Sequence, residues 1–248
     1  MNKPLLYFFL LVIPAFLIFI GLIYHSYKHR GGRITALFFI LGALFFIGRE
    51  TMNALTPHYN GLPQYFFLNR AITIWKAPLP AVIGWLITAY LGWFLAERIL
   101  ANHPRLENRL FPTLLISGVF ASAMALALEG VGIHLGWWNW AKLHIYYTED
   151  PFREYLLDAP FVALWGWFLI VLTFLTPFFL AECSKFRRKG AIRYLWFLIV
   201  PINALLLTKF FYLSRVALIG ALFVLAVLSP MEFDYPAHSS KEAKAKEP

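Results

Sequence analysis

The feature of this sequence that most limits its fold is a series of long apolar stretches without a charged side chain. Four of them, in residues 4–24, 78–96, 110–128 and 159–181, are close to the length that crosses a bilayer. A hydrocarbon core of ~30 Å requires about 20 apolar residues in a helix. A soluble domain of 248 residues, 60% of them hydrophobic, could not bury so much apolar surface. We therefore predict an all-α, polytopic integral membrane protein.

Three shorter apolar stretches complete a predicted set of about seven transmembrane helices. The first covers residues 34–48, which at ~1.5 Å per residue are too few to cross the bilayer. We therefore expect this helix to continue through Arg49 and Glu50. The other two stretches, 194–208 and 216–228, are separated by a short segment that carries charge.

The charge of the chain is distributed as in a membrane protein rather than a nucleic-acid-binding protein. The net charge is +9, and the 22 Lys and Arg residues occur in short runs between apolar stretches. Placing the N-terminus outside puts most of these cations in cytoplasmic segments, as the positive-inside rule favours. We predict a multi-pass protein of the cell (inner) membrane, with residues 1–230 as one transmembrane domain and residues 231–248 as a mobile, polar cytoplasmic tail. Membrane lipid is the expected partner, nucleic acid is not, and homo-oligomerisation is left open.

Two segments, residues about 31–97 and 110–182, resemble each other in the order of their distinctive residues. Each has a glutamate at the end of an apolar stretch, then an Ala-Pro pair, five residues, a Gly-Trp pair and later an Ala-Glu pair. This order predicts a parallel duplication of a two-helix unit, and membrane proteins often hold their ligand between such repeats. The matched residues are Glu50 and Glu129, Pro78 and Pro160, Trp85 and Trp167, and Glu97 and Glu182.

The motifs that are missing exclude several classes of enzyme. The sequence contains no His-Glu-x-x-His zinc motif and no Gly-x-Ser-x-Gly nucleophile elbow. It also lacks the clustered aspartates of prenyl transferases and the histidine boxes of di-iron desaturases. An enzyme with this sequence is therefore expected to use no metal, no other cofactor and no covalent nucleophile.

Three carboxylates remain as candidates for catalysis. Glu129 and Glu50 each end an apolar stretch, and Asp158 stands directly before the second Ala-Pro pair. A carboxyl group removed from water can keep its proton at neutral pH and serve as a general acid. The alternative is structural: each glutamate ends a helix at the interface, with Arg49 neutralising Glu50, and Asp158 caps a helix. The matched position of Asp158 in the first segment is Lys76, so the second segment is the better acidic site.

The segment between Glu129 and Asp158 is unusually aromatic. Aromatic faces attract cations, so beside a proton donor they could stabilise a carbocation. The alternative is an amphipathic segment lying in the outer interface. The residues we expect to contact a ligand are His134, Trp137, Trp138, Trp140, Tyr146 and Tyr147 here, Asn53 in the first segment, and the matched Trp85 and Trp167.

These residues carry a resemblance to a family. The run from Glu129 through Gly136 to Trp140, with Tyr146-Tyr147, Pro160 and Gly166-Trp167, resembles the membrane-bound carotenoid-biosynthesis hydratases of the bisanhydrobacterioruberin and γ-carotene type. It is similar, more distantly, to the small lycopene cyclase domains. The resemblance implies a polytopic helical enzyme that protonates a double bond of a carotenoid. Water then traps the cation in the hydratases, and a second double bond traps it in the cyclases.

The resemblance covers residues 50–182 and has two departures. Asp158-Ala-Pro stands where a cyclase would carry paired glutamates, and the Gly-Val-Pro expected before the last Gly-Trp of a hydratase is missing. Two functions are therefore carried forward. One is a cofactor-independent hydratase or cyclase acting on an isoprenoid lipid. The other is a non-enzymatic membrane transporter or lipid-binding assembly factor, in which Pro201, Asn203 and Lys209 would lie on a polar path.

Overall fold

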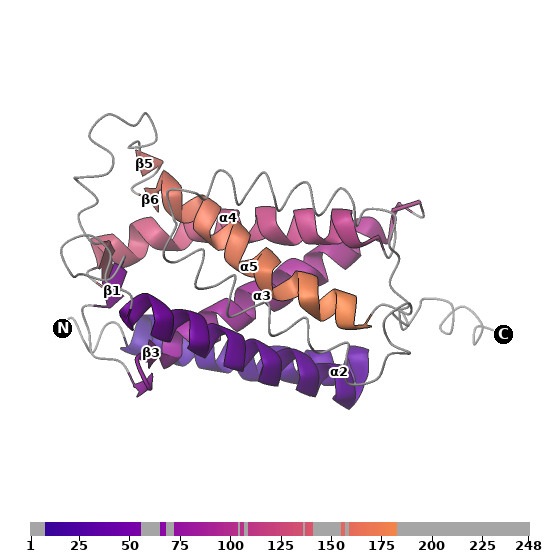
Figure 1. Cartoon of the computed structure of the whole chain (residues 1–248), viewed down its shortest axis with the longest axis horizontal. Coiled ribbons are helices and arrows are strands. Elements are labelled where there is room, and N and C mark those ends of the chain that lie inside the picture. Colours follow the sequence, from indigo (N-terminus) through magenta and orange to yellow (C-terminus); the bar gives the residue numbers. More distant parts are fainter. Residues whose placement is uncertain are drawn as a thin grey trace.

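The computed structural model describes residues 8–55, 65–67, 72–103, 105–106, 109–135, 137–140, 155–156 and 159–182. Long helices run alongside one another, and short strands lie at one end of the bundle (Figure 1). Helix α4 packs against both α3 and α5, and α3 also packs against α2. The helical elements are the π-helical turn η1 (Phe8–Val12), α2 (Ile13–Leu55), α3 (Leu79–Leu100), α4 (Leu110–His134) and α5 (Phe161–Glu182).

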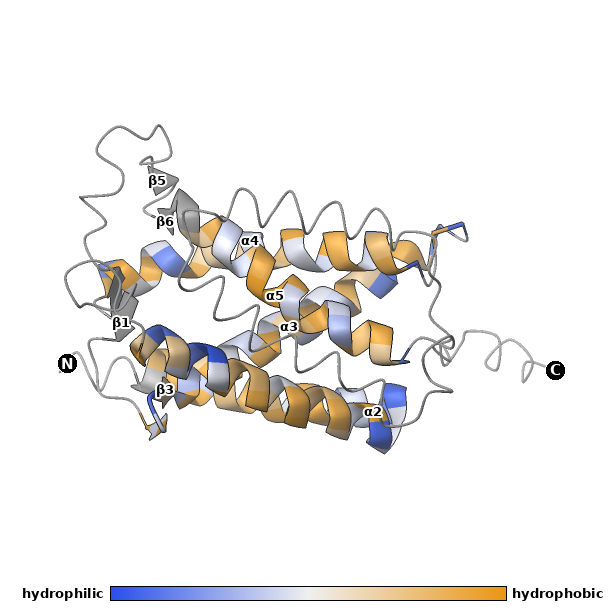
Figure 2. Ribbon diagram, viewed as in Figure 1, coloured by the Kyte–Doolittle hydropathy of each residue, from blue (hydrophilic) through white to orange (hydrophobic). Residues whose placement is uncertain are grey.

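Every long helix in the described part of the chain is apolar enough to cross a membrane. Figure 2 shows hydrophobic residues along the helices and hydrophilic residues gathered near their ends. An all-α membrane protein, as predicted from the sequence, is therefore what this part of the chain forms. The helices predicted in residues 194–208 and 216–228 lie outside the described residues. The candidate spans are Leu10–Leu55, Leu79–Leu100, Leu110–His134 and Ala163–Glu182.

Helix α2 is two helices joined by a sharp reversal at Gly31. The backbone of Gly31 has φ 79° and ψ 160°, a conformation that essentially only glycine adopts without strain. The rings of Phe19 and Phe39 lie 5.5 Å apart, whereas residues this distant in sequence would be ~30 Å apart in a continuous helix. The first two predicted helices therefore form an antiparallel hairpin, with helical residues 13–30 and 32–55.

Three two-stranded ribbons lie at the end of the bundle where α3 and α5 begin and α4 ends. No strand was predicted here from the sequence, because strands of two or three residues are too short to show alternation. In two ribbons the Ala-Pro pair bonds back in the same register: Ala77 pairs with Ile74, and Ala159 pairs with Leu156. The strands are β1 (Tyr65–Phe67) with β4 (Trp138–Trp140), β2 (Thr73–Ile74) with β3 (Ala77–Pro78), and β5 (Tyr155–Leu156) with β6 (Ala159–Pro160).

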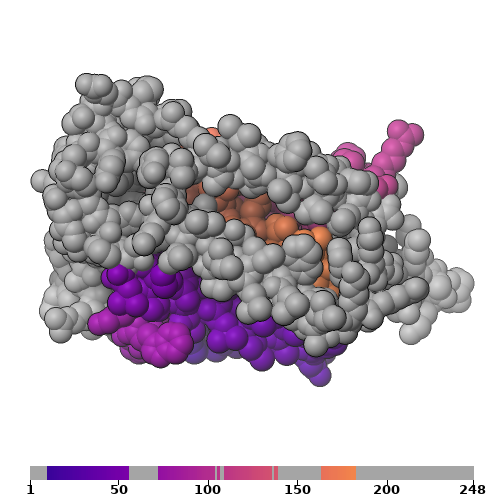
Figure 3. Space-filling view, in the orientation of Figure 1, coloured from indigo at the N-terminus to yellow at the C-terminus, as the bar shows by residue number. Residues whose placement is uncertain are grey.

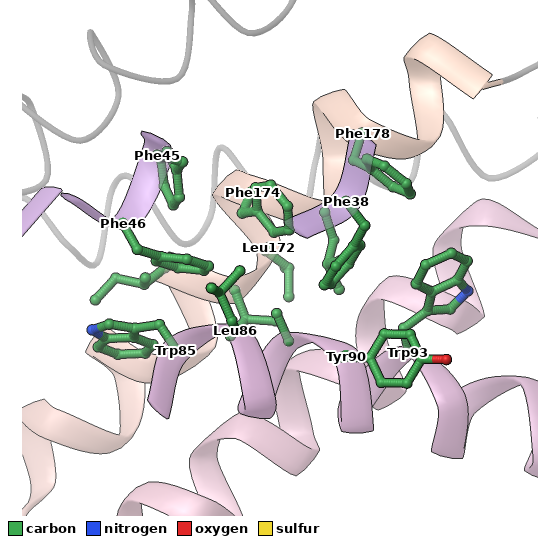
Figure 4. Packing of buried hydrophobic residues seen from close by; sticks show 14 of the residues in the cluster. Phe38, Phe45, Phe46, Trp85, Leu86, Tyr90, Trp93, Leu172, Phe174 and Phe178 are labelled. Carbon is green, nitrogen blue, oxygen red and sulfur yellow. The ribbon is translucent and has the colours of Figure 1, made fainter. Parts of the chain in front are cut away.

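A column of aromatic rings, which we call the aromatic column, runs through the bundle (Figure 4). Phe46 stacks on Trp85 with ring centroids 5.8 Å apart, and its ring lies 5.3 Å from Phe174. Phe38 continues the column, 5.2 Å from Phe174 and 5.4 Å from Trp93. Edge-on and offset contacts of this kind add to the stabilisation that burial of the rings provides. The aromatic column therefore holds α2, α3 and α5 together from one end of the bundle to the other.

Two arginines flank the Gly31 turn and bind glutamates at the ends of two other helices. Arg30 donates to both carboxyl oxygens of Glu97, each over 2.7 Å, and its guanidinium lies 3.6 Å from the centroid of Trp93. Arg33 donates to both oxygens of Glu182, over 3.1 and 2.9 Å. Paired, bidentate contacts are the strong form of this interaction. The hairpin is thereby fastened to the ends of α3 and α5.

Candidate functional site

At the other end of the bundle, Glu50 is buried between α2 and α3. Its side chain is only 1% exposed, and its Oε1 accepts a hydrogen bond from the indole Nε1 of Trp85 over 2.7 Å. Arg49 Nη1 donates to the same oxygen. A carboxylate removed from water requires such donors, because an unsatisfied buried charge is very costly. Arg49 therefore neutralises Glu50, as the structural alternative predicted. That alternative was wrong in placing the glutamates at helix ends, because α2 continues past Glu50 to Leu55 and α4 past Glu129 to His134.

Glu129 is buried in the last part of α4 and receives two indole donors. The residue is 4% exposed. Its Oε1 accepts from Nε1 of Trp167 on α5, and its Oε2 accepts from Nε1 of Trp138, both over 2.8 Å. An indole N–H can only donate, so both contacts require Glu129 to accept. The two donors fix the orientation of the carboxyl group.

The two glutamates belong to one connected set of side chains. The rings of Trp85 and Trp167 lie 4.6 Å apart at an angle of 47°, and each donates to the glutamate of its own segment. We call the set Glu50, Trp85, Trp167, Glu129 and Trp138 the glutamate–tryptophan network. Trp137 adjoins it, with its ring 6.2 Å from that of Trp138. Residues that the sequence matched as equivalent thus make matching contacts.

Gly132 explains how Trp138 reaches a residue nine positions earlier in the chain. The α4 helix ends at His134, and the Trp137 backbone N–H then donates to the Gly132 carbonyl over 2.8 Å, which turns the chain back. The indole of Trp138 lies directly over Gly132, where a β-carbon would stand only 2.1 Å from a ring carbon. Only glycine leaves room for this ring, and the glycine was part of the motif singled out in the sequence.

We expect Gly132→Ala to separate Trp138 from Glu129. The new methyl group overlaps the indole, and relief of such overpacking costs typically 1–3 kcal/mol. Thermal unfolding followed by tryptophan fluorescence should show a lower midpoint and an altered emission spectrum. Gly48→Ala is the matched control, because a β-carbon at this helical glycine meets nothing within 4 Å. An unchanged spectrum in Gly132→Ala would contradict the packing described.

The other residues that we expected to contact a ligand do not all lie near the glutamate–tryptophan network, and some lie outside the described residues. Asn53 is buried one turn after Glu50 on the same helix, whereas His134 is exposed at the end of α4. The backbone of Trp140 pairs with Tyr65 across the β1–β4 ribbon. The Trp140 side chain, Tyr146, Tyr147 and Asp158 lie outside the described residues.

Two further ion pairs were not predicted from the sequence. They are Arg30 with Glu97 and Arg33 with Glu182. A signal was available, because Glu97 and Glu182 are matched residues at the ends of apolar stretches and two arginines flank the Gly31-Gly32 pair. A carboxylate in such a place needs a cation. Within the described ranges, no three His, Cys, Asp or Glu side chains gather as a metal site would require.

The fold and this network define a helical membrane protein with two buried, tryptophan-bound glutamates at one end of its bundle. No family model, no curated protein and no solved structure matches the chain.

Proposed function

We propose that this protein is a membrane enzyme that protonates a carbon–carbon double bond of an isoprenoid lipid, in the first place a carotenoid. The observation that carries the proposal is the buried carboxyl group of Glu129, oriented by two indole N–H donors among further aromatic rings. Such a substrate offers no charge or metal ligand to hold, so apolar surface and one oriented acid suffice.

Glu129 is the proposed proton donor. Its proton adds to one alkene carbon, the π electrons form the new C–H bond, and the other carbon becomes a carbocation. The carboxylate that remains is stabilised by the N–H groups of Trp138 and Trp167, which strengthen as negative charge develops. In a hydratase, water adds to the cation and its released proton returns to Glu129. In a cyclase, a second double bond attacks the cation, and loss of a proton restores the acid.

Glu50 has a supporting role in this proposal. The Arg49 guanidinium neutralises it. Glu50 instead holds Trp85 by its indole, so that Trp85 lies against Trp167. Through this contact Trp85 positions the indole of Trp167, which donates to Glu129. Glu50 is therefore a positioning residue and Glu129 the catalytic one.

The proposal includes a duplicated architecture. Two parallel two-helix units, residues about 31–97 and 110–182, would be related by an axis near the membrane normal that passes between Trp85 and Trp167. Support comes from the paired Glu–Trp hydrogen bonds and from the identical register of the two Ala-Pro ribbons. Seven helices with the N-terminus outside complete it. The Gly31 turn and the α3–α4 connection, where Lys28, Arg98 and Arg105 lie, then face the cytoplasm.

The proposed function is tested by producing the protein in a host that accumulates an acyclic carotenoid. We expect the purified protein to carry the polyene, and the membranes to contain a product that is heavier by one water or is a cyclised isomer. Chromatography with mass spectrometry distinguishes the two products. A bound lipid that is never converted would favour the rival function, a lipid-binding assembly factor. Protein that neither binds nor converts the polyene would contradict the proposal.

A further inference from the structure

The turn between β2 and β3 holds a tryptophan in a conformation that bulky residues rarely adopt. Trp75 has φ 55°, in the left-handed region that glycine and asparagine usually occupy. The turn is fixed on both sides, because Thr73 pairs with Pro78 and the Leu79 N–H donates to the Ile72 carbonyl over 2.8 Å. Strain of this kind persists where the surroundings enforce it, and it often marks a functional segment.

The same turn exposes three large apolar side chains. Trp75 is 78% exposed, Ile72 70% and Ile74 41%. Lys76, which follows them, is also exposed. We call Ile72, Ile74, Trp75 and Lys76 the β2–β3 tip. Figure 3 shows this part of the chain at the lower left of the surface, beside α2. An apolar cluster held outward is unfavourable in water, and such clusters mark protein or membrane contact sites.

The position of the tip identifies that partner. Candidate span Leu79–Leu100 begins directly after the ribbon, so the tip lies at the level where a membrane-spanning helix leaves the hydrocarbon. Tryptophan favours this level of a bilayer, and a lysine beside it can extend its ammonium group to lipid phosphate. We propose that the β2–β3 tip is a membrane anchor, with Trp75, Ile72 and Ile74 inserted at the headgroup boundary and Lys76 facing phosphate.

The second segment has a different sequence at the corresponding turn. In the second segment the two residues between the Leu156 and Ala159 strands are Leu157 and Asp158. An aspartate is repelled by lipid phosphate, whereas Lys76 is attracted to it. The proposal concerns lipid and is independent of the catalytic function proposed above.

The test uses the full chain in vesicles of phosphatidylcholine and phosphatidylglycerol. Cys183, the one cysteine, is replaced by serine, and a single cysteine for an environment-sensitive fluorophore is introduced by Trp75→Cys or Ile72→Cys. Val119→Cys is the matched control, because Val119 is 56% exposed near the middle of α4. Quenchers attached to the lipid headgroup, quenchers deep in the acyl chain and aqueous iodide report where each fluorophore lies.

We expect the labels at positions 72 and 75 to be quenched about threefold more by the headgroup quencher than by the deep one, because the tip lies at the interface. The Val119 label should show the opposite order. Quenching by iodide as strong as for free dye would place the tip in water and overturn the proposal. Labels that neither the lipid quenchers nor iodide can quench would also overturn the proposal, because the tip would then be covered by protein. Energy transfer between labels at position 75 of two copies would overturn it for the same reason.

Discussion

Replacing Glu129 with glutamine is expected to lower turnover of the isoprenoid substrate at least about 100-fold, which corresponds to ~2.7 kcal/mol of transition-state stabilisation. Glutamine has the shape of glutamate but cannot donate a proton of comparable acidity. It keeps one acceptor oxygen for an indole donor, so the variant should still fold and retain bound polyene. Product formation per bound polyene, measured in membranes by mass spectrometry, separates the loss of chemistry from the loss of binding.

Two variants with the same chemical change provide the comparison. Glu97→Gln lies at the opposite end of the bundle and should retain turnover per folded molecule. Glu50→Gln should have an intermediate effect, because it frees the ring of Trp85 without removing the proposed acid. Full turnover in Glu129→Gln, or equal losses in Glu129→Gln and Glu97→Gln, would remove Glu129 from the catalytic role.

A large effect on stability is expected from Arg33→Gln. Glu182 is only 5% exposed, whereas Arg33 is 46% exposed. Loss of the guanidinium leaves a buried carboxylate without its counter-charge, which costs ~2 kcal/mol, between the values for exposed and fully buried pairs. Glu182→Gln should cost less, about 1 kcal/mol, because the arginine that remains can be solvated. Unfolding by detergent titration in mixed micelles measures both values.

The double variant Arg33→Gln with Glu182→Gln provides the control. Removing both charges relieves the penalty of the isolated carboxylate, so the double variant should be more stable than Arg33→Gln alone. A double variant whose loss of stability equals the sum of the two single losses would show that the pair is not coupled. That result would contradict the view that the Gly31 hairpin is fastened to α5 through this contact.

The helices of the described region could be predicted because each is a long apolar stretch. The helix boundaries could not be predicted in the same way. Helix α4 continues past Glu129 to His134, whereas the uncharged stretch in the sequence ends directly before Glu129. The break at Gly31 could be predicted only in part from the sequence. A Gly-Gly pair between charged residues suggests a turn, but the antiparallel hairpin depends on tertiary contacts such as that between Phe19 and Phe39.

The candidate site was partly predictable from internal comparison of the sequence. Matching Glu50 with Glu129 and Trp85 with Trp167 singled out four residues that the structure brings together in one network. Which atoms bond could not be predicted, because the separations are long. The Trp138–Glu129 contact depends on a chain reversal over Gly132, and the exposure of His134 depends on the helix ending there.

The central claim, that Glu129 protonates a double bond, is tested most directly by turnover in heavy water. The protein in membranes that contain the acyclic carotenoid is transferred to heavy water, and the product is analysed by mass spectrometry and nuclear magnetic resonance. We predict one new carbon–deuterium bond, at the alkene carbon that receives the proton, in the product of the natural protein. Glu129→Gln should give almost none of this product. A product without deuterium at that carbon, or equal deuteration by Glu129→Gln, would contradict the claim.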